Sequence, residues 1–166
     1  MIKKLLVICT ALVFIVAVFS AVQADDAKHA FVGVKKCKTC HKKDGTFPAW
    51  EKTGHATAFD KLDDAGKANK ECAPCHTTGV TAKDVLLEGV QCEACHGAGA
   101  DYKKKKVMED REASIAAGMI VPDEKTCAKC HTGAVPEGHK ELAKFDYAKA
   151  KTTGVHTVEP AEKAAE

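Results

Sequence analysis

The pentad Cys-x-x-Cys-His occurs four times in the chain, at residues 37–41, 72–76, 92–96 and 127–131. Two thiols at this spacing can add across the vinyl groups of a porphyrin while the adjacent histidine binds its iron, which is the chemistry of c-type haem attachment. The pattern therefore predicts four haem c groups as cofactors. Their thioether ligands would be Cys37, Cys40, Cys72, Cys75, Cys92, Cys95, Cys127 and Cys130, and their proximal iron ligands His41, His76, His96 and His131.

Zinc sites also use Cys-x-x-Cys pairs, so the pentads need a second criterion. Here a histidine follows every pair directly, and the pentads contain every cysteine of the chain except Cys9. Both features favour haem attachment over zinc. They also leave no cysteine of the mature chain for a disulfide.

Four histidines lie outside the pentads, one for each haem, and are candidate distal iron ligands: His29, His55, His139 and His156. The small neighbours Gly54, Ala56 and Ala58 favour His55, because they would let its backbone approach a flat ring. Met108 and Met119 are alternative sixth ligands, although packing is the simpler role for each. A second histidine would close the iron for electron transfer, whereas an open iron could bind nitric oxide, hydroxylamine or peroxide.

The two central pentads are short of nearby histidines. None occurs in the connector of residues 77–91, and none follows closely after His96. Both central haems would therefore take any sixth histidine from the ends of the chain or from the segment that begins at Trp50. We expect any open haem to be one of these two.

Residues 1–24 have the parts of a secretory signal peptide. Lys3 and Lys4 precede a long apolar run, and small residues end at Ala24, just before two aspartates. Cleavage there would remove Cys9 and export the mature chain, so we expect a periplasmic or extracellular protein. A retained membrane anchor is the alternative, because the apolar run approaches the length that spans a bilayer.

The mature chain should form one haem-bearing domain over residues 25–156, followed by a flexible tail over residues 157–166. It keeps seven aromatic residues, which make a thin core for 142 residues. Four porphyrins would supply the missing apolar surface, so the core should be largely haem and the haem-free chain largely unfolded. Loss of the two N-terminal lysines leaves 23 basic and 23 acidic residues, and this balance does not indicate a nucleic-acid partner.

The fold class that we expect is mainly α with long irregular loops. Helices are predicted over residues 48–62 and 107–117, and after His139 through Leu142 and Phe145. Pro48 suits the first turn of the first helix, and Ala65-Gly66 would follow its end. Residues 77–91 should form an irregular connector broken at Gly79 and Gly89.

Three stretches carry a family resemblance, and together they cover nearly all of the mature chain. They are Phe31-Val32-Gly33 with the first pentad and Trp50-x-x-x-Gly54-His55-Ala56-x-Ala58-Phe59; Gly89-Val90-Gln91 with the third pentad and Gly97-Ala98-Gly99; and Phe145-Asp146-Tyr147 with Gly154-Val155-His156. These stretches resemble the tetrahaem cytochrome c-554 family.

The resemblance implies a mainly α-helical periplasmic electron carrier with three bis-histidine haems and one five-coordinate haem. In it, His55 and His156 match distal ligands. Some relatives place a distal histidine shortly after the third pentad, where residues 100–110 of this chain contain none. Either His29 or His139 would then compensate, or one haem would be open.

We expect an electron-transfer protein, not an enzyme, that shuttles electrons between redox-partner proteins, one of which could be membrane-associated. One alternative is a haem enzyme that reduces a small nitrogen oxide or peroxide at an open iron. Another is a subunit of an extracellular cytochrome filament, in which His29 ligates a haem of the next protomer, although a monomer is favoured. Four consecutive lysines at residues 103–106 are either a solvated turn or a docking patch for an acidic partner.

Overall fold

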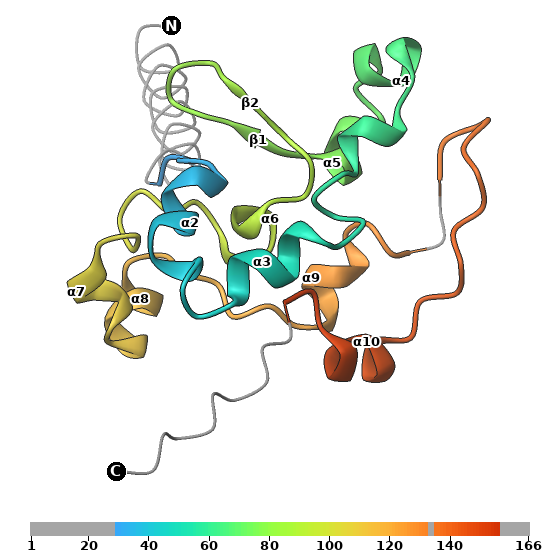
Figure 1. The fold of residues 1–166 in the computed structure, drawn as a ribbon. Helices are drawn as coiled ribbons and strands as arrows, with labels where there is room; N and C mark the ends of the chain where they lie inside the picture. The colour runs from blue at the N-terminus through green and yellow to red at the C-terminus, as the bar shows by residue number, and fades with distance from the viewer. Residues whose placement is uncertain (1–28, 133–134, 157–166) are drawn as a thin grey trace, which may run out of the picture.

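A computed structural model describes residues 29–132 and 135–156 of the chain (Figure 1). The predicted signal peptide, Cys9 and the predicted tail over residues 157–166 lie outside the described residues. Within the described part, no helix is both long enough and apolar enough to cross a bilayer.

Short helices joined by irregular segments make up most of the described chain, which confirms the predicted fold class. The helices are α2 (Val34–His41), α3 (Thr46–Glu51), α4 (Asp64–Ala68), α5 (Ala73–His76), α6 (Cys92–His96), α7 (Lys105–Met108), α8 (Arg111–Ala116), α9 (Glu124–Ala128) and α10 (Tyr147–Thr153), with a 3-10 turn at Phe59–Lys61. Each pentad overlaps one of these helices. The first two end α2 and α5, the third forms α6, and the fourth begins at the end of α9.

The predicted connector between the second and third pentads is a β-hairpin, which the sequence analysis missed. Its strands β1 (Thr77–Val80) and β2 (Leu86–Glu88) are antiparallel and lie above α3 and α6 in Figure 1. Asp84 takes a left-handed backbone conformation (φ 56°) in the turn that joins them. Leu87 of β2 is buried, whereas Val85 and Leu86 are exposed.

The helix predicted over residues 48–62 is wrong beyond its first turns, because α3 ends at Glu51. Thr53 donates its hydroxyl to the Trp50 carbonyl, and residues 52–58 form turns. The His55 carbonyl accepts a hydrogen bond from the Val90 backbone, so a tertiary contact holds this segment outside a helix. The expected break at Ala65-Gly66 is also wrong, since both residues lie inside α4.

Capping aspartates explain two further differences from the predicted helices. Residues 107–117 form two helices rather than one, because the Asp110 side chain accepts from the Ala113 backbone and starts α8 anew. The helix expected between His139 and Phe145 is absent from the described residues there. Helical structure begins instead at Tyr147, where the Asp146 side chain accepts from the Lys149 backbone.

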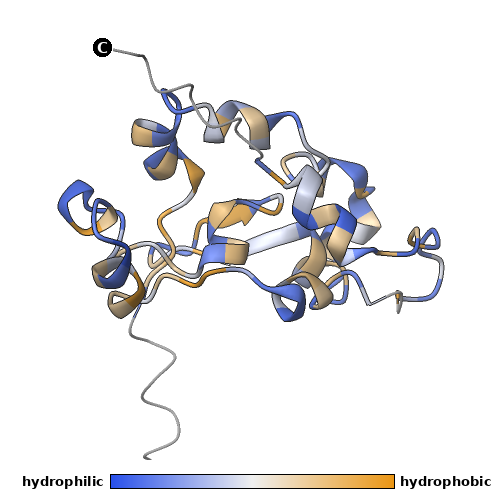
Figure 2. Cartoon of the chain, turned by 90° about the horizontal axis from the view of Figure 1, so that it is seen from below, coloured by the Kyte–Doolittle hydropathy of each residue, from blue (hydrophilic) through white to orange (hydrophobic). Residues whose placement is uncertain are grey.

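The protein core is small, as the aromatic count predicted. The buried hydrophobic residues of the described part are Phe47, Trp50, Ala58, Leu87 and Tyr102. Figure 2 shows polar and apolar residues mixed along the short helices rather than separated into layers. So few buried side chains leave room for a non-protein core.

Glu93 joins the first pentad to the third. Its side chain is 2% exposed, although it lies between the two cysteines of a pentad. Its carboxyl oxygens accept hydrogen bonds from the backbone N–H groups of Val32 at 3.0 Å, Gly33 at 2.7 Å and Gly99 at 2.6 Å. The segment that enters α2 is thereby fixed against α6 and the residues after it.

Candidate haem-binding sites

The thiols of different pentads lie next to one another. The Cys37 thiol of α2 lies beside the Cys92 thiol of α6. Their interaction, followed by burial, raises the pKa of Cys37, whereas the same interaction lowers the pKa of Cys92 against the effect of burial. The Cys75 and Cys130 thiols are also in contact. Burial, followed by that contact, raises the pKa of Cys130 above its ordinary value.

A further contact links the third and fourth pentads. Burial, together with the nearby Cys127 thiol, raises the pKa of Cys95. The attachment sites are therefore neighbours in the spatial order first, third, fourth, second, which differs from their order in the sequence. All eight described cysteines carry free thiols, so none is joined in a disulfide.

Three of the four pentad histidines face a second histidine ring. The ring centroids lie 5.9 Å apart for His55 and His131, 6.0 Å for His76 and His139, and 5.9 Å for His96 and His156. Each pair joins one pentad histidine to one histidine from outside the pentads. His55, His139 and His156 are thus each placed opposite a different pentad.

This separation suits two axial ligands of one iron. An imidazole nitrogen binds a first-row metal at about 2.0 Å, so two rings on opposite sides of one ion place their centroids about 6 Å apart. The separation of each pair also lies within the range of about 4.5–7 Å found for ordinary ring contacts, so the spacing permits a metal ion between the rings.

The Nδ1 atoms of five histidines are held by oxygen acceptors. The contacts are His29 to Asp101 at 2.6 Å, His41 to Asp44 at 2.7 Å, His76 to the Ala58 carbonyl at 2.6 Å, His96 to the Ile120 carbonyl at 3.1 Å and His139 to the Lys140 carbonyl at 2.5 Å. Metal-ligating histidines usually donate their second ring N–H in this way, which fixes the tautomer and leaves Nε2 for the metal.

His55 lies in the turns after α3 and is held by its backbone. Val90 donates its N–H to the His55 carbonyl, and the Trp50 indole donates to the Val90 carbonyl at 2.9 Å. Burial lowers the pKa of His55, and the charge of His131 acts in the same direction. A depressed pKa favours the neutral imidazole, which is the form that ligates iron.

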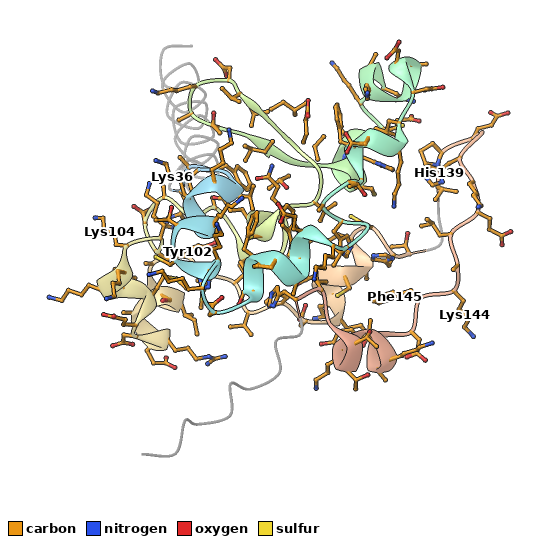
Figure 3. All side chains as sticks on the ribbon, in the orientation of Figure 1. Lys36, Tyr102, Lys104, His139, Lys144 and Phe145 are labelled. Carbon is orange, nitrogen blue, oxygen red and sulfur yellow. The ribbon has the colours of Figure 1, made fainter. Side chains whose placement is uncertain are left out.

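His96 has a similar environment. Burial lowers its pKa, and the His156 and His41 rings act in the same direction against its hydrogen bond to Ile120. His156 lies just beyond α10, and His139 lies on the extended segment between α9 and α10 (Figure 3). Two of the three facing histidines are therefore contributed by the C-terminal part of the described chain.

The first pentad differs from the other three. Among the described residues, His41 has no second histidine ring in contact, and neither does His29. The sequence analysis expected any open haem at a central pentad, but the ring pairs favour the first. Met108 is partly buried and accepts a weak hydrogen bond from the Ser114 hydroxyl at 3.8 Å, which fits a packing role.

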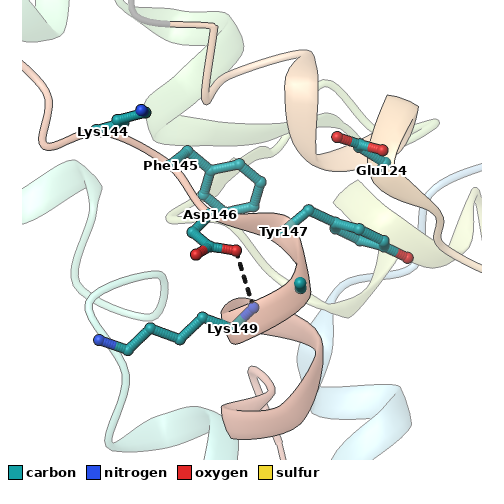
Figure 4. Close-up of a pocket in the computed structure, with 7 residues that line it drawn as sticks. Glu124, Lys144, Phe145, Asp146, Tyr147 and Lys149 are labelled. Carbon is teal, nitrogen blue, oxygen red and sulfur yellow. Dashed lines mark hydrogen bonds between the residues drawn. The ribbon is translucent and has the colours of Figure 1, made fainter.

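A hollow of about 660 Å³ lies beside the fourth pentad (Figure 4). Its lining residues are Glu124, Lys144, Phe145, Asp146, Tyr147, Ala148 and Lys149. Phe145 connects it to the pentad, because its ring stacks on His131. Aromatic and charged groups here would suit the ring and the propionates of a porphyrin.

The residues present fit c-type haem. Each pentad supplies two thiols and an adjacent imidazole, three of the four imidazoles face a second ring at metal-spanning distance, and the protein core is small. No group of three or more His, Cys, Asp or Glu side chains in residues 29–132 and 135–156 is arranged to hold a bare metal ion.

Sequence reasoning missed the groups that hold the imidazoles. Asp44 and Asp101 could have been suspected, because each is a carboxylate close after a pentad. The carbonyls of Ala58 and Ile120 carry no sequence signal, since every residue has a carbonyl. The role of Glu93 also depends on tertiary contacts alone.

Comparison with known proteins agrees with the fold and the pentads. The family described as cytochrome c554 and c-prime matches residues 36–97, which include the first three pentads. Cytochrome c-554 of Nitrosomonas europaea is 26% identical over 163 residues, covering 77% of this chain and 68% of that protein.

A solved structure gives the same result for the fold. Reduced cytochrome c554 from Nitrosomonas europaea superposes with a TM-score of 0.51 at 24% identity, over 76% of this chain and 79% of that one. This match shows a shared fold. The chain is therefore similar to the cytochrome c-554 family over residues 36–97 and shares the fold of cytochrome c554.

Proposed function

We propose that the protein is an electron carrier with four c-type haems, one on each pentad. The observation that carries the proposal is the set of three histidine pairs, each 5.9–6.0 Å apart and each containing one pentad histidine. A bound haem iron would supply reversible one-electron chemistry. Two imidazoles per iron would leave no position for a substrate, which favours electron transfer over catalysis.

The chain's own residues would set the ligands of each iron. The Ala58 and Ile120 carbonyls would orient His76 and His96, and Asp44 would orient His41. Each of these acceptors fixes a ring by its Nδ1 atom and leaves Nε2 for iron. Little rearrangement would then accompany electron gain or loss at the iron.

The thiol contacts support a route for electrons through the molecule. Cys37 adjoins Cys92, Cys95 adjoins Cys127, and Cys75 adjoins Cys130. Haems bound there would be close neighbours in the order first, third, fourth, second. Electrons would enter and leave at the first and second haems, which lie at the two ends of this series.

Export and partners follow from the same proposal. The signal segment at residues 1–24 would deliver the chain to the periplasm, where its donor and acceptor would be redox proteins. The four lysines at residues 103–106 are all exposed, and Figure 3 shows Lys104 on the opposite side of the molecule from Lys144. This cluster could dock one acidic partner near the first haem.

Intact mass spectrometry of the purified holoprotein, with haem quantification, tests the proposal. We expect the mass of the chain without residues 1–24 plus four covalent haems. Replacing both cysteines of any single pentad by serine should lower the number of attached haems by one, whichever pentad is changed. A wild-type count below four would contradict the proposal.

A haem enzyme is the second candidate, and the first pentad favours it. His41 is the pentad histidine without a facing histidine ring among the described residues. An open iron there would bind carbon monoxide after reduction. Absence of any carbon monoxide spectrum in the reduced holoprotein would exclude this function.

A further inference from the structure

His29 is held from two sides although it lies at the start of the described chain. Its Nδ1 atom donates to an Asp101 carboxylate oxygen at 2.6 Å. A Cβ atom at Gly118 would come within 2.8 Å of the His29 Nε2 atom and 3.0 Å of both adjacent ring carbons, so the bare glycine backbone packs against the ring. Gly118 also has a φ of +96°, which disfavours any side chain.

The segment after His29 is fixed to the same part of the fold. The Ala100 backbone donates to the Ala30 carbonyl at 3.1 Å, and Glu93 accepts from the backbone of Val32 and Gly33. This segment leads directly into α2, which carries the cysteines and histidine of the first pentad. His29 is therefore anchored five residues before α2, against segments that follow the third pentad, whose Cys92 lies beside Cys37.

The three histidine pairs leave one histidine outside the pentads for the first pentad. His55, His139 and His156 each face a different pentad histidine, so His29 and His41 are the two that remain. Both have the same arrangement at Nδ1, where an aspartate accepts the ring N–H: Asp101 for His29 and Asp44 for His41. Each ring thus offers Nε2 to a metal.

We propose that Asp101 is a positioning residue that holds His29 as the sixth ligand of the haem attached to Cys37 and Cys40. This inference rests on the proposed function, since it requires a haem on the first pentad. The Asp101 carboxylate fixes the proton of His29 on Nδ1 and increases the basicity of Nε2. It therefore stabilises the oxidised iron and lowers the reduction potential of that haem.

Carbon monoxide binding to the reduced holoprotein tests the ligand. We expect no carbon monoxide-bound haem in the wild type and one of four in H29A. Adding Cys37→Ser and Cys40→Ser to H29A should abolish that binding, because the haem concerned is then missing. Haem counting by mass on every variant separates loss of a ligand from loss of a haem.

Potentiometry tests the positioning role of Asp101. Asp101→Asn should raise the midpoint potential of one haem and leave the other three unchanged, and Asp101→Glu should restore most of the shift. Asp60→Asn is the matched control, since Asp60 is an exposed aspartate that has no histidine contact. If H29A assembles with fewer than four haems, the midpoint potentials of Asp101→Asn test whether His29 ligates the first haem.

Two results would overturn the inference while leaving four attached haems. One is a wild-type protein that already binds carbon monoxide at one haem and does so unchanged in H29A, which would make the first haem open. The other is an Asp101→Asn potential identical to that of Asp60→Asn. A wild-type count below four haems would instead refute the proposed function itself.

Discussion

At the residue scale, Glu93 is a buried carboxyl group surrounded by backbone donors. It lies between the two cysteines of the third pentad, yet its carboxyl group is buried and accepts from the backbones of Val32, Gly33 and Gly99. Buried backbone donors need acceptors, and a carboxyl with two oxygens can serve several at once. The residue therefore ties two attachment sites together without touching iron.

Glu93→Gln should destabilise the protein without removing a haem. One carboxyl oxygen becomes an NH₂ group that cannot accept, so at least one buried N–H loses its partner, which costs about 1–3 kcal/mol. Urea unfolding of the holoprotein measures the loss. Glu88→Gln is the matched control because Glu88 is exposed on β2, and equal stability of the two variants would contradict this role.

At the scale of elements, the hairpin and the turns after α3 position a ligand together. Gly89 follows β2 and lies against the His55 segment: a Cβ there would be 2.7 Å from the Ala56 carbonyl oxygen and 3.2 Å from that of His55. Its φ is +75°. Glycine is thus required at position 89 both for its backbone conformation and for the close approach.

Gly89→Ala should therefore disturb the haem of the fourth pentad. The added methyl group would push the His55 segment away from His131, and we expect part of that haem to become high-spin in electron paramagnetic resonance. Gly138→Ala is the control, because Gly138 has a similar φ of +81° but nothing within 4 Å of its Cβ position. Similar spectra for the two variants would show that the close approach does not matter.

The sequence contains the four pentads and predicts the helical fold class, because both depend on residues that are close together in the chain. It did not predict the hairpin, since Thr77–Val80 and Leu86–Glu88 are short and only half-buried. Nor did it predict where the helix after Pro48 ends, because a bond from Val90 to His55 decides that. Histidine pairing needs tertiary contacts, so four candidates could be named but not matched to pentads.

At the scale of the whole molecule, the protein supplies a shell of short helices with few buried side chains. Five hydrophobic residues of the described part are buried, which is too few for a stable domain of this length. The missing apolar surface would come from the haems. Folding and haem attachment should then be coupled, as they are in other metal-dependent small domains.

Replacing all eight pentad cysteines by serine should leave the exported chain largely unfolded. We expect weak helical circular dichroism, no cooperative thermal transition and a hydrodynamic radius well above that of the holoprotein. Removing only Cys37 and Cys40 should give a folded protein of lower stability. A cooperative transition in the haem-free chain would show that its own core is sufficient.

Near-infrared magnetic circular dichroism of the oxidised holoprotein tests the central claim most directly, because it identifies the axial ligand pair of each low-spin haem. The histidine pairs His55–His131, His76–His139 and His96–His156 predict bis-histidine ligation for at least three haems, and His29 predicts it for the fourth. A histidine–methionine band, or a high-spin signal from more than one haem, would contradict the account.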